Sequence, residues 1–220
     1  MSAGMSTVAI LPVKRFELAK QRLGAALDAQ QRRQLAEAMV GDVLAALRAT
    51  AGIERILVVT RQASVGELAT RAGGEVVEDQ REDGQSAAAQ QGIARALELD
   101  AQRVLLVPGD CPALDPAELE ALLANAPSSP PSVTIVPDRH GTGTNALLIA
   151  PPAALAPSFG PDSFERHRRD AIQAGVSFSV AHPPSLLLDV DTGADLDALR
   201  ERLAATRGLA ARTRRTLDSL

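Results

Sequence analysis

The chain has 220 residues, of which 45% are hydrophobic and 23% charged, and its formal net charge is −4. This composition is typical of a globular protein. The negative net charge argues against a nucleic-acid-binding protein, which usually has a basic face. No apolar run reaches the roughly 18 residues that a membrane span requires. Cys111 is the only cysteine, which excludes an intrachain disulfide framework and favours a cytoplasmic location with Cys111 as a small core residue.

Apolar runs with strand character recur along the whole chain. Several are almost continuous stretches of Val, Ile and Leu, a pattern that predicts strands buried on both faces. The predicted strands are residues 7–13, 55–60, 75–78, 103–108, 132–137, 145–150, 177–181 and 186–191.

Segments with helical periodicity lie between these runs. The first spans 28–50, with Asp28 as the predicted N-cap and apolar residues along one stripe. That stripe consists of Leu35, Met39, Val43 and Leu47. Further helices are predicted at 64–73 (beginning at Ser64), 84–99, 115–126, 162–175 and 192–207.

The alternation of strands and helices predicts an α/β fold with a mixed, mainly parallel sheet flanked by helices. The two strands within 132–150 follow each other closely, so we expect them to pair antiparallel. We find no linker and predict a single domain over 1–220, with its core at about 7–206. The basic tail, 207–220, is expected to be a helix end or a frayed terminus.

Ligands of open α/β sheets bind beyond the carboxyl ends of the strands, so the residues after each strand are candidates for function. Only two of the 23 basic residues are lysines, and Lys14 directly follows the first predicted strand. This position favours contact between a compact positive charge and phosphate, to which Arg15 and Arg22 could add charge. Lys20 is equally well explained as a solvated loop residue. The loop lacks the glycines of a P-loop or of a dinucleotide-binding turn.

After the third strand, Gly84 opens a turn, and Gln85 and Ser86 begin an Ala-rich helix. The free N–H groups at such a helix start can bind an anion or the edge of a base. The plainer alternative is a turn with an ordinary helix cap.

Three aspartates lie just after or at the end of two other predicted strands. Asp110 lies in the turn P-G-D-C-P, and Asp115 is the better cap for the next helix, which leaves Asp110 for another role. Asp189 and Asp191 are two residues apart on a predicted strand, so both carboxylates should point to one face. Neighbouring negative charges are costly without a cation, and oxygen ligands favour a hard divalent metal ion. The alternative is solvation of a strand end, or capping of the next helix by Asp191 and Thr192.

Hydroxyl groups, glycines and a helix start mark a second candidate anion site. Its residues lie in the segments D-R-H-G-T-G-T-N and F-G-P-D-S-F. They are Thr144, Asn145, Gly160 and Ser163. His140 and His167 lie in or near these segments, and we expect them to be surface or packing residues rather than catalytic bases.

The ordered set of these segments resembles one protein family. The segments ILPVKRFELAKQRLG, VPGDCPAL, HGTGTNALL, FGPDSFERH and LLLDVDT follow one another as in the guanylyltransferases of coenzyme F-420 biosynthesis, which act on phosphoenolpyruvate or 2-phospho-L-lactate. More remotely, the chain is similar to molybdenum-cofactor guanylyltransferases and nucleotide-sugar pyrophosphorylases. The resemblance runs over about residues 8–205.

The resemblance implies a Rossmann-like nucleotidyltransferase fold of the nucleotide-diphospho-sugar transferase kind. It also implies that the phosphate of a small phospho-acid attacks the α-phosphate of GTP and expels diphosphate, with Mg²⁺ as cofactor. The implied metal ligands are Asp110, Asp189 and Asp191, which with Lys14 are the catalytic candidates. The implied phospho-acid ligands are Thr144, Asn145, Gly160 and Ser163. The nucleotide is expected at Lys14, Arg15, Arg22, Gly84, Gln85 and Ser86.

Phosphoenolpyruvate is the expected acceptor, because the Arg-rich, Lys-poor composition is typical of a high-GC bacterium. Alternatives are 2-phospho-L-lactate or 3-phosphoglycerate as the acceptor, and, in another class, a non-catalytic nucleotide-binding regulatory domain. The expected partners are GTP and a small phospho-acid, with no nucleic acid and no membrane. The choice between a monomer and a homodimer stays open.

Overall fold

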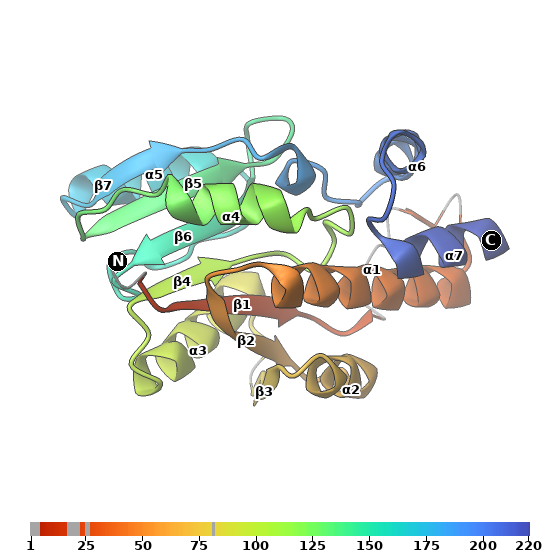
Figure 1. The fold of residues 1–220 in the computed structure, drawn as a ribbon, viewed down its shortest axis with the longest axis horizontal. Helices are drawn as coiled ribbons and strands as arrows, with labels where there is room; N and C mark the ends of the chain where they lie inside the picture. Colours follow the sequence, from red (N-terminus) through yellow and green to blue (C-terminus); the bar gives the residue numbers. More distant parts are fainter. Residues whose placement is uncertain (1–4, 17–22, 25–26, 81) are drawn as a thin grey trace.

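The computed structural model describes residues 5–16, 23–24, 27–80 and 82–220. Its seven-stranded sheet has helices on both faces (Figure 1). The strands are β1 (Thr7–Val13), β2 (Ile53–Thr60), β3 (Glu75–Glu78), β4 (Arg103–Leu106), β5 (Ser132–Pro137), β6 (Thr144–Ala150) and β7 (Ser177–Val180). The helices are α1 (Ala29–Ala49), α2 (Ala63–Arg71), α3 (Gln85–Glu98), α4 (Pro116–Ala124), α5 (Ser163–Gln173), α6 (Gly193–Ala205) and α7 (Ala211–Ser219), with a short 3₁₀ helix, η3 (Pro184–Leu186).

The strand order of the sheet is β3-β2-β1-β4-β6-β5-β7. β6 pairs antiparallel with β4 and β5, and the other neighbouring pairs are parallel. The predictions of a mixed, mainly parallel sheet and of antiparallel pairing within 132–150 are therefore confirmed. The chain proceeds from β1 outward to β3 and then returns to place β4 on the other side of β1. Ligands of such sheets bind where the order reverses, beyond the carboxyl ends of β1 and β4.

Alternate residues of β1 enter two separate hydrophobic cores, because successive side chains of a strand point to opposite faces. Ala9 and Leu11 pack in the core formed with α1, α2, α4 and α6. Val8 and Ile10 pack in the core formed with α3 and α5. Burial on both faces explains why the sequence of β1 is almost continuously apolar.

The predicted helices are all present. Asp28 caps α1, whose predicted apolar stripe is buried, and Asp115 caps α4. The predicted start of α2 at Ser64 is wrong by one residue: the helix begins at Ala63, because the backbone carbonyl of Gln62 accepts its first hydrogen bonds. Among the described helices, none combines the length and the apolar character that crossing a membrane requires.

The strand predicted at 186–191 is wrong. Its backbone groups bond to loop and side-chain atoms instead of a neighbouring strand. The N–H of Val190 donates to the carbonyl of Asp110 (3.1 Å), and the carbonyl of Leu186 accepts from the side-chain amide of Asn145 (2.6 Å). Leu186 and Val190 are both 0% exposed, so the apolar run indicated burial and not strand pairing.

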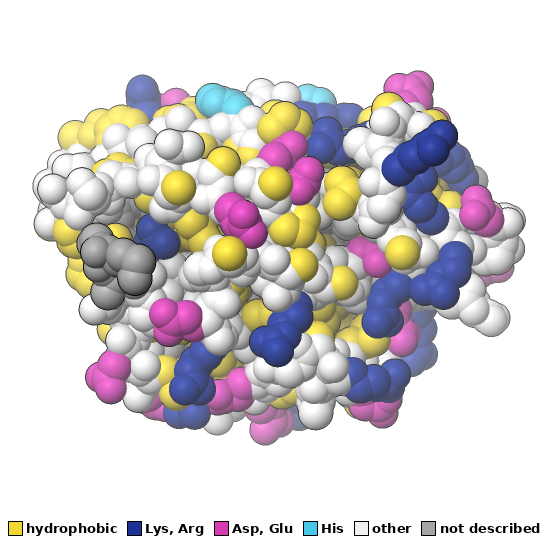
Figure 2. Space-filling view, viewed as in Figure 1, with side chains coloured by type: hydrophobic (Ala, Val, Ile, Leu, Met, Phe, Trp, Pro, Cys, Tyr) yellow, Lys and Arg dark blue, Asp and Glu magenta, His cyan; other side chains and the backbone are white. Residues whose placement is uncertain are grey.

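The basic tail contains a docked helix, α7, which packs on α1 (Figure 1). The buried carboxylate of Asp42, within α1, accepts from the N–H groups of Arg212 (3.0 Å) and Thr213 (2.7 Å) and so caps the start of α7. Figure 2 shows basic side chains gathered over α6 and α7, with acidic ones among them. The expectation of a helix end or a frayed terminus is therefore wrong, because the tail forms a separate helix. No local pattern could indicate this contact, since Asp42 lies 170 residues before Arg212.

Gly92→Ala is expected to destabilise the protein by about 1–3 kcal/mol, the usual effect of overpacking a core. A Cβ at Gly92 in α3 would lie 2.3 Å from Cγ2 of Ile10 and 3.1 Å from Cγ2 of Val59. Urea unfolding followed by circular dichroism measures the change. Gly193→Ala is the matched control, because its Cβ would meet open space at the start of α6. Equal stability of Gly92→Ala and the wild type would contradict the close packing of α3 on β1.

Candidate active site

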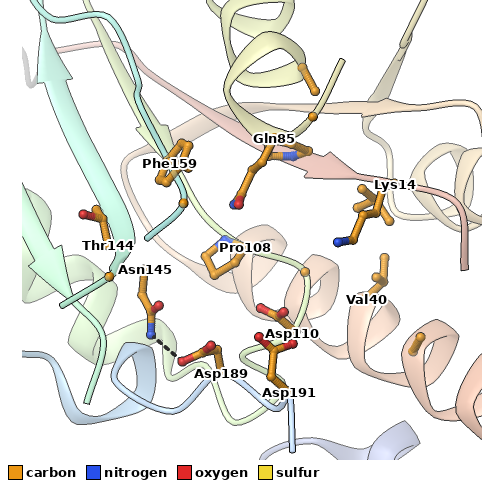
Figure 3. Close-up of a pocket in the computed structure, with 18 of the residues that line it drawn as sticks. Lys14, Val40, Gln85, Pro108, Asp110, Thr144, Asn145, Phe159, Asp189 and Asp191 are labelled. Atoms are coloured by element: carbon orange, nitrogen blue, oxygen red, sulfur yellow. Dashed lines mark hydrogen bonds between the residues drawn. The ribbon is translucent and has the colours of Figure 1, made fainter. Parts of the chain in front are cut away.

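A cavity of about 420 Å³ opens at the point where the strand order reverses (Figure 3). This volume is in the range of small-molecule sites. Its walls come from the residues after β1 and β4, the starts of β6, α3 and α5, and the segment 186–191. The predicted residues that line it are Lys14, Gly84, Gln85, Asp110, Thr144, Asn145, Gly160, Ser163, Asp189 and Asp191.

Two other predicted nucleotide-binding residues are used elsewhere and do not line this cavity. Arg15 forms an ion pair with Glu82 (2.8 Å). The hydroxyl of Ser86 accepts from the backbone N–H of Phe159 (2.8 Å), so it holds the loop before α5. Outside the described residues lie Lys20 and Arg22.

The structure brings the carboxylates of Asp110, Asp189 and Asp191 together at one wall of the cavity (Figure 3). The hydrogen bond from Val190 N–H to the Asp110 carbonyl joins the two segments that carry them. Burial, and then the charge of Asp110, raise the pKa of Asp189 above its ordinary value. Asp191 adds to this effect, and a hydrogen bond from the Asn145 amide (3.3 Å) opposes it. The ionised form of Asp189 is therefore held at an electrostatic cost.

Asp195, in the first turn of α6, fixes the backbone of Asp191. Its Oδ2 accepts from the N–H groups of Asp191 (3.1 Å) and Thr192 (2.7 Å), and its Oδ1 pairs with Arg139. Burial acts to raise the pKa of Asp195, but the Thr192 and Asp191 hydrogen bonds and the Arg139 charge bring the pKa below its ordinary value. Sequence reasoning missed this residue, although T-G-A-D at a helix start is close to a capping-box pattern.

The chemistry of this wall fits a hard divalent cation. Among the described residues, no three Asp, Glu, His or Cys side chains are already placed to enclose a metal ion. Mg²⁺, however, keeps several waters and binds through one or two carboxylates together with substrate phosphates, so it needs no complete protein cage. A cation between these carboxylates would relieve the repulsion that raises the pKa of Asp189.

Asp138 organises the loop that leads into β6. Its carboxylate accepts from the N–H groups of His140 (3.0 Å), Thr142 (3.0 Å) and Gly143 (2.9 Å). Burial acts to raise the pKa of Asp138, but the backbone hydrogen bonds together lower it by more. The net pKa is therefore below its ordinary value. Asp138 also lines the cavity. Sequence reasoning missed it, although an Asp before H-G-T-G is typical of such turns.

Of the predicted phospho-acid residues, Thr144 and Asn145 lie across the cavity from Lys14 (Figure 3), and Gly160 and Ser163 also line it. Ser163 is the first residue of α5 and is 1% exposed. Gly160 has φ +116°, a conformation that favours glycine, and shapes the turn before that helix. The side-chain amide of Asn145 donates to the carbonyl of Leu186 and to the carboxylate of Asp189, so it positions the 186–191 segment.

Several residues that sequence reasoning did not select also line the cavity. Asp79 and Glu82 follow β3, and Phe159 precedes Gly160. The helix α1 contributes Ala36, Met39 and Val40. The apolar stripe of α1 indicated that Met39 is buried, but periodicity does not say which buried residues border a cavity.

The chain matches known proteins over nearly its whole length. Residues 7–203 match the family model described as "Guanylyl transferase CofC like". A phosphoenolpyruvate guanylyltransferase of Conexibacter woesei is 52% identical over 98% of this chain and 97% of its own. One of Rubrobacter xylanophilus is 42% identical over 96% and 100%. A 2-phospho-L-lactate guanylyltransferase of Methanothermobacter thermautotrophicus is 37% identical over 87% and 83%.

Solved structures support the fold at much lower identity. A protein described as a nucleotide-diphospho-sugar transferase from Desulfovibrio desulfuricans superposes with a TM-score of 0.74 and 17% identity, covering 98% of this chain and 96% of its own. A nucleotidyl transferase from Methanothermobacter gives a TM-score of 0.66 and 20% identity, covering 93% and 100%. The fold is thus the predicted nucleotidyltransferase fold, and the predicted family resemblance is confirmed. By the match of its residues 7–203 and by relatives of near-equal length, this chain belongs to the CofC-like guanylyl transferase family.

Proposed function

We propose that this chain is a guanylyltransferase that joins GTP to phosphoenolpyruvate and releases diphosphate, as a step of coenzyme F-420 biosynthesis. The relatives at 52% and 42% identity bear the name of this activity. One structural observation carries the proposal: the starts of α3 and α5 border the same cavity as Lys14 and the three carboxylates. Helix starts attract anions, so this cavity suits two substrates that both carry phosphate.

In the proposed reaction, a phosphate oxygen of phosphoenolpyruvate attacks the α-phosphorus of GTP. The bond from that phosphorus to the β,γ-diphosphate breaks, which gives enolpyruvoyl-diphospho-guanosine. The attacking phosphate is already ionised at neutral pH, so no side chain needs to remove a proton from it. The barrier consists of charge repulsion and alignment, which binding groups of the enzyme reduce.

The cavity offers a separate place for each substrate. Lys14, Gly84 and Gln85 lie on the side that we assign to GTP, with Lys14 neutralising part of the triphosphate charge. Thr144, Gly160 and Ser163 lie on the side that we assign to the phospho-acid. This division places the α-phosphate of GTP and the acceptor phosphate next to the carboxylate wall.

We propose Mg²⁺ as the cofactor, held by Asp110, Asp189 and Asp191 together with the phosphates of the substrates. When bound, Mg²⁺ would screen the phosphate charges and help to align the reacting groups. We also propose a cytoplasmic location. The single, buried cysteine and the proposed use of GTP support it.

Diphosphate release from GTP and Mg²⁺ tests the proposal, with phosphoenolpyruvate, 2-phospho-L-lactate or 3-phosphoglycerate added in turn. We expect release with phosphoenolpyruvate. Release with only one of the other acids would change the acceptor and keep the reaction. Binding of GTP without release in any mixture would favour the non-catalytic regulatory domain.

Ser163→Ala is expected to raise the KM for phosphoenolpyruvate about tenfold, the effect of losing one hydrogen bond to a charged group. The KM for GTP should change little, because Ser163 lies at the start of α5 and not on the side assigned to GTP. Steady-state diphosphate release at varied acid and fixed GTP measures both constants. Ser179→Ala is the control, since that hydroxyl lies on β7 and pairs with Thr134. A larger change in the KM for GTP than for the acid would contradict the assignment.

A further inference from the structure

His167 is a fully buried histidine behind the side of the cavity that we assign to the phospho-acid. It lies in α5, is 0% exposed, and uses both ring nitrogens in hydrogen bonds. Nδ1 lies 3.0 Å from the hydroxyl of Thr144, and Nε2 accepts from the backbone N–H of Ser158 (2.8 Å). Its ring meets the ring of Phe159 edge-on, with centroids 5.4 Å apart. One side chain therefore contacts both β6 and the loop before α5.

The bonding pattern assigns the protonation state of His167. A backbone N–H can only donate, so Nε2 carries no hydrogen, and the neutral ring donates from Nδ1 to the Thr144 hydroxyl. Burial, and then the charge of Arg166, lower the pKa of His167 to about 4, with Asp170 opposing them. The ring is thus neutral at physiological pH and enclosed by protein, which excludes it as a base for the substrate.

The loop before α5 has two further anchors. The guanidinium of Arg166 donates to the carbonyls of Ser158 (2.7 Å) and Pro161 (2.9 Å). The hydroxyl of Ser86, in the first turn of α3, accepts from Phe159 N–H (2.8 Å). His167 differs from these two anchors because it also reaches Thr144, on the strand that forms the other wall.

We propose that His167 is a positioning residue that holds the two walls of the acceptor subsite, Thr144 and the Ser158–Gly160 loop, at the separation a small phospho-acid requires. The inference rests on the proposed function, because it takes this side of the cavity as the acceptor subsite. Both Thr144 and Gly160 line the cavity, whereas His167 stands behind them. Groups held in place before binding lose less freedom when the ligand arrives, so the hydrogen bonds of His167 favour acceptor affinity.

Three variants separate the contacts of His167. His167→Phe keeps a flat ring of similar size and removes both hydrogen bonds. His167→Gln retains an acceptor that can reach Ser158 N–H. Thr144→Val removes the partner hydroxyl with little change of shape. His182→Gln, at an exposed histidine after β7, is the control.

Diphosphate release at varied phosphoenolpyruvate and varied GTP gives both KM values, and a thermal melt reports folding. We expect His167→Phe to raise the KM for phosphoenolpyruvate at least about tenfold, the scale of one lost hydrogen bond, because both bonds of the ring are removed. The KM for GTP should be nearly unchanged. His167→Gln should restore part of the loss. Adding Thr144→Val to His167→Phe should raise the KM for phosphoenolpyruvate by less than the product of the two single effects, because residues that share a bond are not additive.

The outcomes distinguish this inference from the proposed function. No release by the wild type with any acid would reject the function, and this inference with it. An active wild type and a folded His167→Phe with an unchanged KM for phosphoenolpyruvate would reject this inference alone. Equal rises in both KM values, or a loss of kcat that only follows a lower Tm, would make His167 a structural residue. If His167→Phe does not fold, His167→Gln decides by the same criterion.

Discussion

Asp189→Asn is expected to reduce the rate of diphosphate release at least about a hundredfold, the usual effect of losing a group that stabilises transition-state charge. The same variant is expected to raise the Tm of the cation-free protein. The activity falls because the proposed Mg²⁺ loses a carboxylate at the wall it shares with Asp110 and Asp191. The stability rises because burial and the neighbouring Asp110 raise the pKa of Asp189, so its ionised form destabilises the fold. The Asn side chain can still accept the hydrogen bond from Asn145.

The gain in stability from Asp189→Asn should depend on pH in a definite direction. The pKa of Asp189 in the folded chain lies above its ordinary value of 3.8. In the pH window between these two values the folded state binds more protons than the unfolded state, so wild-type stability falls as the pH rises through it. The difference in Tm between variant and wild type should therefore be smallest near pH 4 and grow as the pH rises through the raised pKa of Asp189.

Thermal melts with and without Mg²⁺, paired with the release assay, measure these effects. Mg²⁺ should raise the Tm of the wild type more than that of Asp189→Asn, because only the wild type offers the complete set of carboxylates. Asp197→Asn is the matched control, since Asp197 is an exposed residue of α6 paired with Arg200. An inactive Asp189→Asn with a lower Tm than the wild type would mean that Asp189 is a structural residue.

Lys14→Met is expected to lower kcat/KM for GTP at least about a hundredfold, the scale of removing one preorganised charge from a phosphate-transfer site. Lys14 follows β1 and lines the cavity across from the acceptor side, where its ammonium group can meet the triphosphate (Figure 3). Lys14→Arg should recover part of the loss, because it restores the charge but not the compact shape of the ammonium group.

The adjacent Arg15 provides the comparison for Lys14. Its guanidinium is engaged by Glu82 and does not line the cavity, so Arg15→Gln should have a much smaller effect on kcat/KM. Kinetics at two salt concentrations would show whether the loss in Lys14→Met is electrostatic, since added salt weakens interactions between exposed charges. Wild-type kinetics in Lys14→Met, or a larger loss in Arg15→Gln, would contradict the role given to Lys14.

Local patterns predicted most of the fold because they encode burial and periodicity. The apolar runs located β1 to β7, and Asp28 and Asp115 marked helix starts through bonds within the next few residues. The same logic failed at 186–191, where a buried apolar run bonds to the Asp110 carbonyl and the Asn145 side-chain amide and forms no strand. It also failed for α7, whose start is capped by the distant Asp42.

The candidate site divides in the same way. The expectation that functional residues follow strands selected Lys14, Asp110, Asp189 and Asp191, all of which line the cavity. The carboxylates of Asp189 and Asp191 were predicted to share one face of a strand, but 186–191 forms no strand. The segment that carries them meets Asp110 instead through the Val190 hydrogen bond.

By itself, the sequence determined the α/β class, the strand and helix periods, the family and the positions where polar side chains interrupt buried runs. Only the tertiary structure decided which of these side chains meet, how Asp189 acquires a raised pKa, and how Asn145, Asp195 and His167 hold the walls of the cavity. The physical reason is the range of the interactions. Periodicity and capping act over one or two turns, whereas burial, charge repulsion and hydrogen bonds between segments depend on distances that exist only once the sheet has brought its strand ends together.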